Sequence, residues 1–417
     1  MKKKVELLLP AGNIEKLDYA INYGADAVYL GMVDFSLRTM RKGDVITADN
    51  LKKAIDLAHS YGKKAYMTLN IYAYDEDIDN LYKNIDVIKD AKPDALIVSD
   101  FGIMNVLKNR IPEIDIHVST QTNTLNSEAV KFWRDYGATR VILAREVSIS
   151  KLAQIKKNVP DIELEVFVHG AQCVSLSGRC LLSDFMTHGE RKANHGGCSQ
   201  PCRWKYKLLE ETRPGEYYEI EETARGTHIL STKDLALINY LPQLIEAGAD
   251  SFKIEGRTKS LYYVSAVAKA YRSALDAYYQ GEKPDNNEMF NQLLKIGNRG
   301  YTTGFYLDEQ DHSGYSYDVS KGLAGSDFLF EFWDKSEKDG KTLFKIKIKN
   351  KILLNDIVEI ITPTECFEST IEKIYNNSLD EEKEVGNTND EIYVQLSVTP
   401  QNHKYALART IGIKNVR

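Results

Sequence analysis

Residues 163–202 read ELEVFVHGAQCVSLSGRCLLSDFMTHGERKANHGGCSQPC, an apolar run that passes directly into a loop rich in cysteine and glycine. The run ELEVFV has the length and composition of a buried strand. Five glycines interrupt residues 169–202, so no long helix or strand can continue through them. Four thiols on a loop at the end of a core strand predict a metal centre.

Four of the chain's five cysteines lie in this loop with the spacing C-x6-C-x17-C-x3-C, namely Cys173, Cys180, Cys198 and Cys202. Zinc sites usually use paired C-x2-C knuckles, because each knuckle turns two sulfurs onto one small ion, and neither pair here has that spacing. An iron–sulfur cubane is larger and accepts thiolates from more scattered positions. The spacing therefore favours an iron–sulfur cluster, with zinc and free or catalytic thiols as alternatives.

Other residues bear on the ligand set. His188 and His195 lie in the same loop and can replace a thiolate, although polar loop histidines are the commoner case. Disulfides are disfavoured because nothing marks the chain as secreted. Cys366 is far from the other four cysteines in sequence and is interpreted as structural.

Length and composition bound the class of protein. The chain has 417 residues, enough for two domains, with the 43% hydrophobic and 27% charged content typical of a soluble globular protein. The net charge of −6 indicates no general affinity for nucleic acid. The first apolar run is interrupted by Glu6 and ends at Pro10, and no apolar stretch of about 18 residues follows. We therefore expect a cytoplasmic protein with reduced thiols and no membrane partner.

Short apolar runs alternate with amphipathic helical patterns over most of the chain, which predicts a parallel sheet covered by helices. Eight such units in about 280 residues fit a closed (β/α)8 TIM-like barrel of the α/β class. An open doubly wound sheet usually carries a glycine fingerprint after its first strand, where this chain has PAGNIEK. The predicted strands are 5–11, 27–31, 64–71, 95–100, 115–121, 140–146, 163–170 and 251–256.

Two segments depart from this alternation. Residues 203–232 contain RWKYKLLEE and EYYEIEE around RPG, which predicts a β-hairpin insertion after strand seven. Residues 326–417 show six short strand patterns separated by turn residues, which predicts a small C-terminal antiparallel β-barrel. The barrel domain is then 1–325. Within it we expect a helix over 235–248 and a loop over 281–288.

Polar side chains follow the predicted barrel strands at their C-terminal ends, where a TIM barrel carries its active site. Several are arginines, whose planar guanidinium groups bind carboxylates and phosphates through paired hydrogen bonds. Pairing with a neighbouring carboxylate, such as Arg145 with Glu146, explains any single arginine equally well. The candidate substrate-binding residues are Arg38, Gln121, Arg145, His169, Arg179, Lys253, Glu255 and Arg257, with Asn70 and Asp100 at the same level.

Residues 179–213 form a basic segment in a chain that is acidic overall. Seven lysine or arginine residues face four acidic ones there, a local balance of +3, and Trp204 and Tyr206 are interleaved with them. Such a segment can hold a nucleic-acid backbone and stack on an unpaired base. A solvated hairpin face fits the same pattern.

The motifs HGAQCVSLSGRCLLSDF, GGCSQPCRWKY and FKIEGRTKSLYYV, together with the opening ELLLPAG and GADAVYLG, resemble peptidase family U32 over nearly the whole chain. The segments RPGEY and NRGYTTGF and the C-terminal β-domain are similar to its branch of prephenate-dependent tRNA uridine hydroxylation proteins.

This resemblance implies a 4Fe–4S cluster on Cys173, Cys180, Cys198 and Cys202. It also implies prephenate, a small dicarboxylate, as the co-substrate that supplies the hydroxyl oxygen. The product would be 5-hydroxyuridine at the tRNA wobble position. We expect the C-terminal domain to dock tRNA, and a homologous U32 subunit is a possible partner.

Three other functions remain open at this stage. A peptidase or collagenase needs one nucleophile paired with a histidine or a zinc helix of the H-E-x-x-H type, and a set of four cysteines serves ligation better. Hydroxylation of another substrate, such as an rRNA cytidine or a quinone precursor, would use the same cluster. A non-catalytic RNA-binding scaffold would leave the arginines at the barrel mouth without a use.

Overall fold

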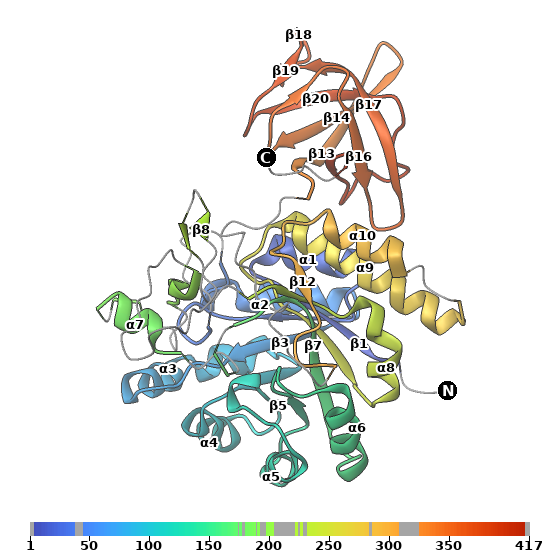
Figure 1. The fold of residues 1–417 in the computed structure, drawn as a ribbon. Coiled ribbons are helices and arrows are strands. Elements are labelled where there is room, and N and C mark those ends of the chain that lie inside the picture. The colour runs from blue at the N-terminus through green and yellow to red at the C-terminus, as the bar shows by residue number, and fades with distance from the viewer. Residues whose placement is uncertain are drawn as a thin grey trace.

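The computed structural model describes residues 4–37, 45–173, 175–176, 180–188, 190–191, 197–203, 222–223, 226–227, 232–282, 286–307 and 325–412. A barrel wrapped by helices forms the larger part of the molecule, and a separate all-β unit lies beside it (Figure 1). The part of the chain that the structure describes contains no helix long and apolar enough to cross a membrane.

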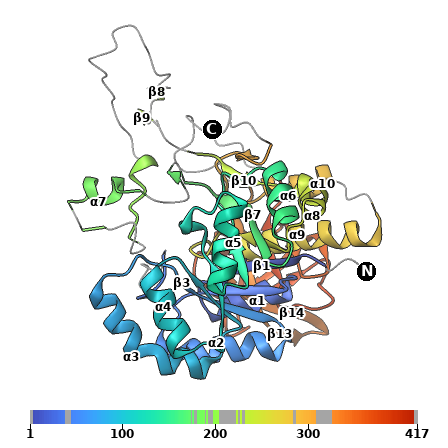
Figure 2. The same ribbon diagram turned by 90° about the horizontal axis from the view of Figure 1, so that it is seen from below.

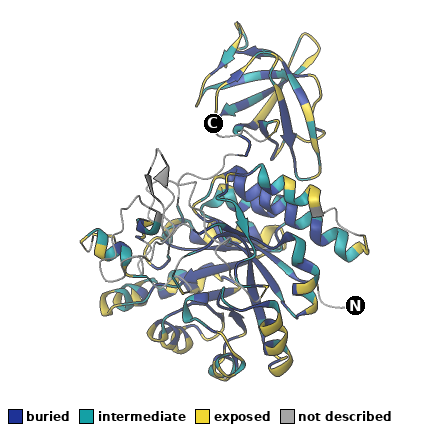
Figure 3. Ribbon diagram, in the orientation of Figure 1, coloured by how far each residue is buried: buried dark blue, intermediate teal, exposed yellow. Residues whose placement is uncertain are grey.

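Eight parallel strands form a closed barrel, because β11 pairs with both β1 and β7. This confirms the predicted (β/α)8 architecture. The strands are almost wholly buried, whereas the surrounding helices turn exposed faces outward (Figure 3). The barrel strands are β1 Glu6–Pro10, β2 Ala27–Leu30, β3 Lys64–Leu69, β4 Ala95–Val98, β5 Asp115–Val118, β6 Arg140–Ile142, β7 Glu163–Ala171 and β11 Ser251–Ile254.

Each helix presents one apolar stripe to the barrel. In α2, Leu51, Ala54, Ile55 and Ala58 are buried at helical spacing, and the backbone N–H of Thr47 donates to Asn50 Oδ1 at 2.8 Å at the start of the helix. The view of Figure 2 shows α1 to α6 placed around the sheet. The helices are α1 Ile14–Asn22, α2 Ala48–Ser60, α3 Asp75–Ala91, α4 Phe101–Arg110, α5 Ser127–Tyr136, α6 Ile149–Asn158 and α9 Leu261–Gln280.

Two short strands extend the barrel sheet beyond β7. Strand β10, Asp234–Ala236, pairs antiparallel with the end of β7, and β12, Tyr301–Thr302, pairs parallel with β10. The predicted helix over 235–248 is therefore wrong at its start, since η5 and the short α8, Leu241–Glu246, begin only after this strand. Backbone pairing with the edge of β7 overrides local helical propensity there.

The loop expected over 281–288 is partly helical, because α10 spans Asn286–Leu294. Of the predicted hairpin insertion, the structure describes a small antiparallel pair, β8 Glu222–Thr223 with β9 Gly226–Thr227. The pairing predicted around RPG lies outside the described residues. The short α7, Leu182–Met186, lies within the cysteine loop.

The C-terminal unit is an antiparallel sheet with its own apolar core, as predicted. Strand β16 pairs with both β21 and β17, which closes the sheet on itself. Alternate residues of β14, Phe344, Ile346 and Ile348, point into this core. Its main strands are β13 Phe328–Lys338, β14 Lys341–Ile348, β16 Ile357–Ile361, β17 Cys366–Tyr375, β20 Glu391–Leu396 and β21 Leu407–Thr410.

Candidate functional site

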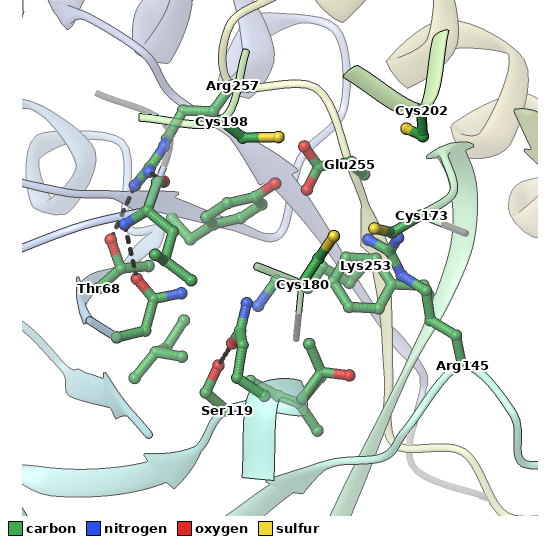
Figure 4. A pocket seen from close by; sticks show the side chains of 18 of the residues that line it. Thr68, Ser119, Arg145, Cys173, Cys180, Cys198, Cys202, Lys253, Glu255 and Arg257 are labelled. Carbon is green, nitrogen blue, oxygen red and sulfur yellow. Dashed lines mark hydrogen bonds between the residues drawn. The ribbon is translucent and has the colours of Figure 1, made fainter. Parts of the chain in front are cut away.

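One cavity opens at the C-terminal ends of the barrel strands, where the cysteine loop borders it (Figure 4). Polar side chains reach its walls from β3 and β11, from the segments that follow β5 and β6, and from the loop after β7. The residues predicted from the sequence that line this cavity are Gln121, Arg145, Cys173, Cys180, Cys198, Cys202, Lys253, Glu255 and Arg257.

The four cysteines of the loop border the same cavity as free thiols. Cys198 is exposed and the other three are half-buried. Backbone N–H groups approach two of the sulfurs, Leu182 N to Cys180 Sγ and Gln200 N to Cys198 Sγ, each at 3.4 Å. Such N–H donors to sulfur are the contacts that tune cluster-bound thiolates.

Among the described residues, no group of three or more His, Cys, Asp or Glu side chains is close enough to hold one metal ion. A cubane presents four separate iron corners and takes thiolates that lie further apart. The donor set, four free thiols on one cavity with N–H donors to sulfur, fits an iron–sulfur cluster in its chemistry.

Arg145 projects from the end of β6 over the cavity wall. Its Nη1 donates to the carbonyl oxygen of Ala171 at 3.0 Å, and its guanidinium lies 4.3 Å from the ring centroid of Phe167. Within the described part of the chain, no carboxylate lies at ion-pair distance from Arg145, so the rim pair with Glu146 is not observed. A guanidinium fixed by one carbonyl and one ring face keeps further N–H donors for a ligand.

Arg257 is buried and held by neutral groups. Its Nη1 donates to Ser36 Oγ at 2.5 Å and to Thr68 Oγ1 at 2.8 Å, and Nη2 donates to the Leu37 carbonyl. Gly31 allows this packing, since a Cβ there would lie 2.2 Å from Thr68 Oγ1 and 2.5 Å from Arg257 Nη1. Arg257 is therefore a buried cation anchored in the cavity wall by these contacts.

Lys253 lies at the floor of the cavity and belongs to a buried charge network inside the barrel. Its Nζ is 2.7 Å from Glu165 Oε1, and Glu165 Oε2 accepts from Arg140 Nη1 at 3.0 Å. Arg140 also pairs with Glu6 and Glu163, each at 2.6 Å. Burial of Arg140 alone would lower its pKa. The neighbouring carboxylates, above all Glu165, outweigh this effect and raise the pKa of Arg140, so its guanidinium stays charged.

Sequence reasoning missed this network because Glu6, Arg140 and Glu165 occur inside runs that read as apolar strands. The available signal was the period of two: Glu163, Glu165 and Phe167 share the inward face of β7. The same alternation places Thr68 with Asn70, and Ser119 with Gln121, on the cavity wall.

Two amide residues complete the polar wall. Gln121 accepts from Ser119 Oγ through its side-chain oxygen, and Asn70 Oδ1 accepts from the backbone N–H of Leu37 at 3.1 Å. Asp100 does not reach the cavity. Its carboxylate caps α4 by accepting from the backbone N–H of Ile103 at 2.9 Å.

His169 is not brought into the cavity. The pairing of β7 with β11 places Phe167 opposite Lys253 and His169 opposite Ile254, so one extra residue is inserted into β7. This bulge moves His169 to the outer face. There its ring packs against Tyr263, Tyr271 and Tyr301, and burial lowers its pKa to about 3. His169 is therefore not among the residues that line this cavity, and its contact with the substrate stays a prediction.

Several predicted residues lie outside the part of the chain that the structure describes. They are Arg38, Arg179, His195, Trp204 and Tyr206, and with them 17 of the 35 residues of the basic segment 179–213. His188 is described and exposed on the loop after α7.

Comparison with known proteins gives this geometry a family context. The model of peptidase family U32 matches residues 12–315, and the model of the U32 C-terminal domain matches residues 325–409. The chain belongs to peptidase family U32. The two matched regions correspond to the barrel with its cysteine loop and to the antiparallel unit.

Relatives within the family carry two kinds of name. The tRNA hydroxylation protein P of Haemophilus influenzae is 38% identical over 419 residues, 89% of each chain, and that of Escherichia coli is 36% identical over 416 residues, again 89% of each. An uncharacterized protease of Methanocaldococcus jannaschii is 37% identical over 426 residues, 99% of this chain and 100% of its own.

Proposed function

We propose that this U32 protein is a tRNA hydroxylase that forms 5-hydroxyuridine at the wobble position, with prephenate as donor of the hydroxyl oxygen. The proposal also places a 4Fe–4S cluster on Cys173, Cys180, Cys198 and Cys202. One observation carries it: one cavity is lined both by four cysteine side chains that form no disulfide and by cationic side chains. Relatives named for tRNA hydroxylation supply the reaction class.

The cationic wall suits a small dicarboxylate. Arg145 keeps N–H donors for one carboxylate, while Arg257 and Lys253 add positive charge on the opposite wall and the floor. The rings of Tyr29 and Phe167 and the side chain of Ile142 border the same space and exclude water from it. Ion pairs formed in such surroundings are stronger than in water.

The cluster would be held beside this cavity by the four thiolates. When bound, a 4Fe–4S cluster supplies electron transfer at a potential set by its surroundings. The polar amide of Gln121 lies on the cavity wall, where it can hydrogen-bond a pyrimidine edge or the donor. We assign docking of the tRNA body to the C-terminal domain and the basic segment 179–213.

Proteolysis, the reaction in the older family name, receives less support. Within the described part of the chain, no histidine is hydrogen-bonded to a cysteine or serine, so the pair that activates a nucleophile is absent there. His169 lies on β7, close to the start of the cysteine loop. Its side chain is buried on the outer face of that strand.

The test compares tRNA nucleosides by mass spectrometry from a strain that lacks the gene and from the same strain complemented. We expect 5-hydroxyuridine to disappear and to return with the wild-type gene. The Cys198→Ser variant should fail to restore it and should lose most of about four iron atoms per chain after anaerobic purification. Cys366→Ser is the matched control, since Cys366 lies on β17 of the other domain, and it should behave as wild type.

An unchanged level of 5-hydroxyuridine in tRNA from the deletion strain would contradict the proposal that tRNA uridine is the substrate. Loss of 5-hydroxycytidine from rRNA in its place would redirect the proposal to another RNA. Stoichiometric zinc without iron in the purified protein would contradict the cluster.

A further inference from the structure

Lys253 occupies an unusual position for a lysine. It is 4% exposed, on strand β11, and its side chain lines the floor of the cavity. The Nζ atom lies 4.6 Å from the ring centroid of Tyr29 and 5.7 Å from that of Phe167. An amine between two aromatic faces at the bottom of a pocket has little water to stabilise its charge.

The negative charge of Glu165, the ion-pair partner of Lys253, is also balanced by a second cation, Arg140. Glu165 is fully buried, and its two oxygens are divided between Lys253 Nζ at 2.7 Å and Arg140 Nη1 at 3.0 Å. Because Arg140 remains charged, Glu165 keeps a cationic partner when Lys253 gives up its proton. Glu165 can then accept a proton from the amine and return it, as a general base and acid does.

The charged and titratable groups named here lie on β5, β6 and β7 and at Glu255, which directly follows β11. Glu165 and Glu255 favour its charged form, whereas Arg140 and burial oppose it, and the net direction is a lowered pKa with burial as the largest cause. His117 on β5 is buried and has a strongly lowered pKa, so it adds no charge. Lowering the pKa of a buried lysine increases the fraction of the free amine, which is the nucleophile.

Arg145 lies next to the same aromatic ring. Its guanidinium is 4.3 Å from the Phe167 centroid, and Lys253 Nζ is 5.7 Å from it. Arg145 and Lys253 both line the cavity, so a ligand whose carboxylate binds Arg145 lies in the space that Nζ of Lys253 borders. In a 2-oxo acid the carbon next to the carboxylate is a ketone, which an amine can attack.

We propose that Lys253 forms an imine with the ketone carbon of a 2-oxo acid bound at Arg145. The ligand class follows from the proposed function, since prephenate is a 2-oxo acid. The free amine adds to the ketone carbon, the carbonyl electron pair moves to oxygen, and one proton passes from nitrogen to that oxygen through Glu165 to give a neutral carbinolamine. Glu165 takes a proton from nitrogen and delivers it to the hydroxyl, which leaves as water while the C=N bond forms. No oxidant or reductant is needed.

The test traps this adduct in the full-length protein purified anaerobically. The protein is incubated with pyruvate and sodium cyanoborohydride, digested and mapped by mass spectrometry. We expect the peptide that contains Lys253 to gain the mass of pyruvic acid less one oxygen atom. Prephenate should give the corresponding adduct and should compete with pyruvate, whereas succinate, which has no ketone, should compete without forming one.

Variants separate the two roles. Lys253→Arg keeps a cation beside Glu165 and should give no adduct at this position. Glu165→Gln keeps the shape of the side chain but removes the proton acceptor, so trapping should slow by about a hundredfold. Lys373, which is exposed on the C-terminal domain, is the internal control for non-specific labelling.

Absence of an adduct at residue 253 in the wild-type protein, or labelling of Lys373 to the same extent, would overturn the imine. Lys253 would then be a permanent ammonium that only binds a carboxylate. The readout does not involve RNA. An adduct in a protein that leaves tRNA unmodified would contradict the proposed function alone, and tRNA hydroxylation without any trappable adduct would contradict the imine alone.

Discussion

Arg145 and Arg257 illustrate how differently two arginines at one cavity can be held. Arg145 makes one hydrogen bond to a backbone carbonyl and lies over a ring, whereas Arg257 is fixed by Ser36, Thr68 and the Leu37 carbonyl. The first can reorganise around a ligand with little loss of protein contacts. The second contributes to the wall itself.

Replacing Arg145 by Lys should weaken prephenate binding on the order of tenfold to a hundredfold, because the planar fork of donors is lost while the charge is kept. Thermal stability should change little. Arg257→Lys should weaken binding as well and, unlike Arg145→Lys, should destabilise the fold by about 1–3 kcal/mol through its lost buried hydrogen bonds. Calorimetric titration and thermal denaturation measure the two effects. Equal affinity in all three proteins would show that neither arginine binds the donor.

His169 makes a separate prediction about stability and pH. Its pKa falls from 6.5 to about 3 in the folded protein because burial disfavours the imidazolium. The unfolded chain therefore binds one more proton between these values, and stability that is complete above pH 6.5 is lost as the pH falls. This histidine alone should remove about 2 kcal/mol between pH 7 and pH 5.

Urea denaturation across that range tests the prediction. The His169→Phe variant should show a flatter dependence of unfolding free energy on pH, whereas His188→Asn, a change at an exposed loop histidine, should follow the wild type. An identical slope in His169→Phe would mean that the pKa of His169 is the same in the folded and the unfolded protein.

At the level of single elements, glycines at strand ends decide how closely the cavity walls approach. Gly31 follows β2 and faces the Arg257–Thr68–Ser36 cluster, and Gly170 near the end of β7 has φ +110° with Glu255 O only 2.4 Å from a built Cβ. A side chain at either place would push apart groups that form the wall.

Gly31→Ala should cost about 1–3 kcal/mol of stability, because the added methyl group overlaps a packed polar cluster. It should also weaken donor binding, since Arg257 must move. Gly297→Ala is the matched control: a Cβ at Gly297 meets nothing within 4 Å. Thermal denaturation of both variants decides the point, and equal melting temperatures would show that the cluster yields without cost.

The bulge in β7 shows how one inserted residue changes the face of a strand on which the following side chain lies. Without it His169 would continue the inward series of Glu165 and Phe167; with it the histidine joins a tyrosine cluster outside the barrel. No local sequence signal marks this insertion, because it results from pairing with β11.

At the scale of the whole molecule, the C-terminal domain is fixed to the barrel by buried polar contacts. The hydroxyl of Tyr23 on α1 lies 2.8 Å from the Tyr405 carbonyl oxygen and 3.0 Å from that of Ile361. Arg409, 1% exposed, pairs with Glu359 and donates to Tyr262 Oη of α9 at 3.1 Å. The domain thus covers the side of the barrel formed by α1, α9 and α10, away from α7 and the cysteine loop (Figure 1).

Arg409→Met should therefore destabilise the protein by about 1.5–3 kcal/mol, since Glu359 loses one of its two cationic partners and keeps Lys295, 2.9 Å away. Two melting transitions should replace one in scanning calorimetry as the domains separate. Lys373→Met, which removes an exposed ion pair of the same domain, should cost less than about 1 kcal/mol. A single unchanged transition in Arg409→Met would show that other contacts hold the domains together.

From the sequence one could predict the helices and strands and the place where polar side chains gather. Alternating strand and helix patterns have periods that depend only on local side-chain directions, so the eight barrel strands and the antiparallel domain followed from them. The cysteine spacing pointed to one loop, and strand-end positions placed Gln121, Arg145, Lys253, Glu255 and Arg257 on one cavity.

Only the tertiary structure decided which of these side chains are anchored, paired or turned away. Glu165 and Arg140 lie 25 residues apart in the chain and meet because neighbouring strands close a barrel, and the strand β10 exists because β7 offers it an edge. Contacts of this kind depend on the register between strands, and a shift of one residue reverses the face on which a side chain lies. Register is a property of the assembled sheet, so it could not be read from any single strand.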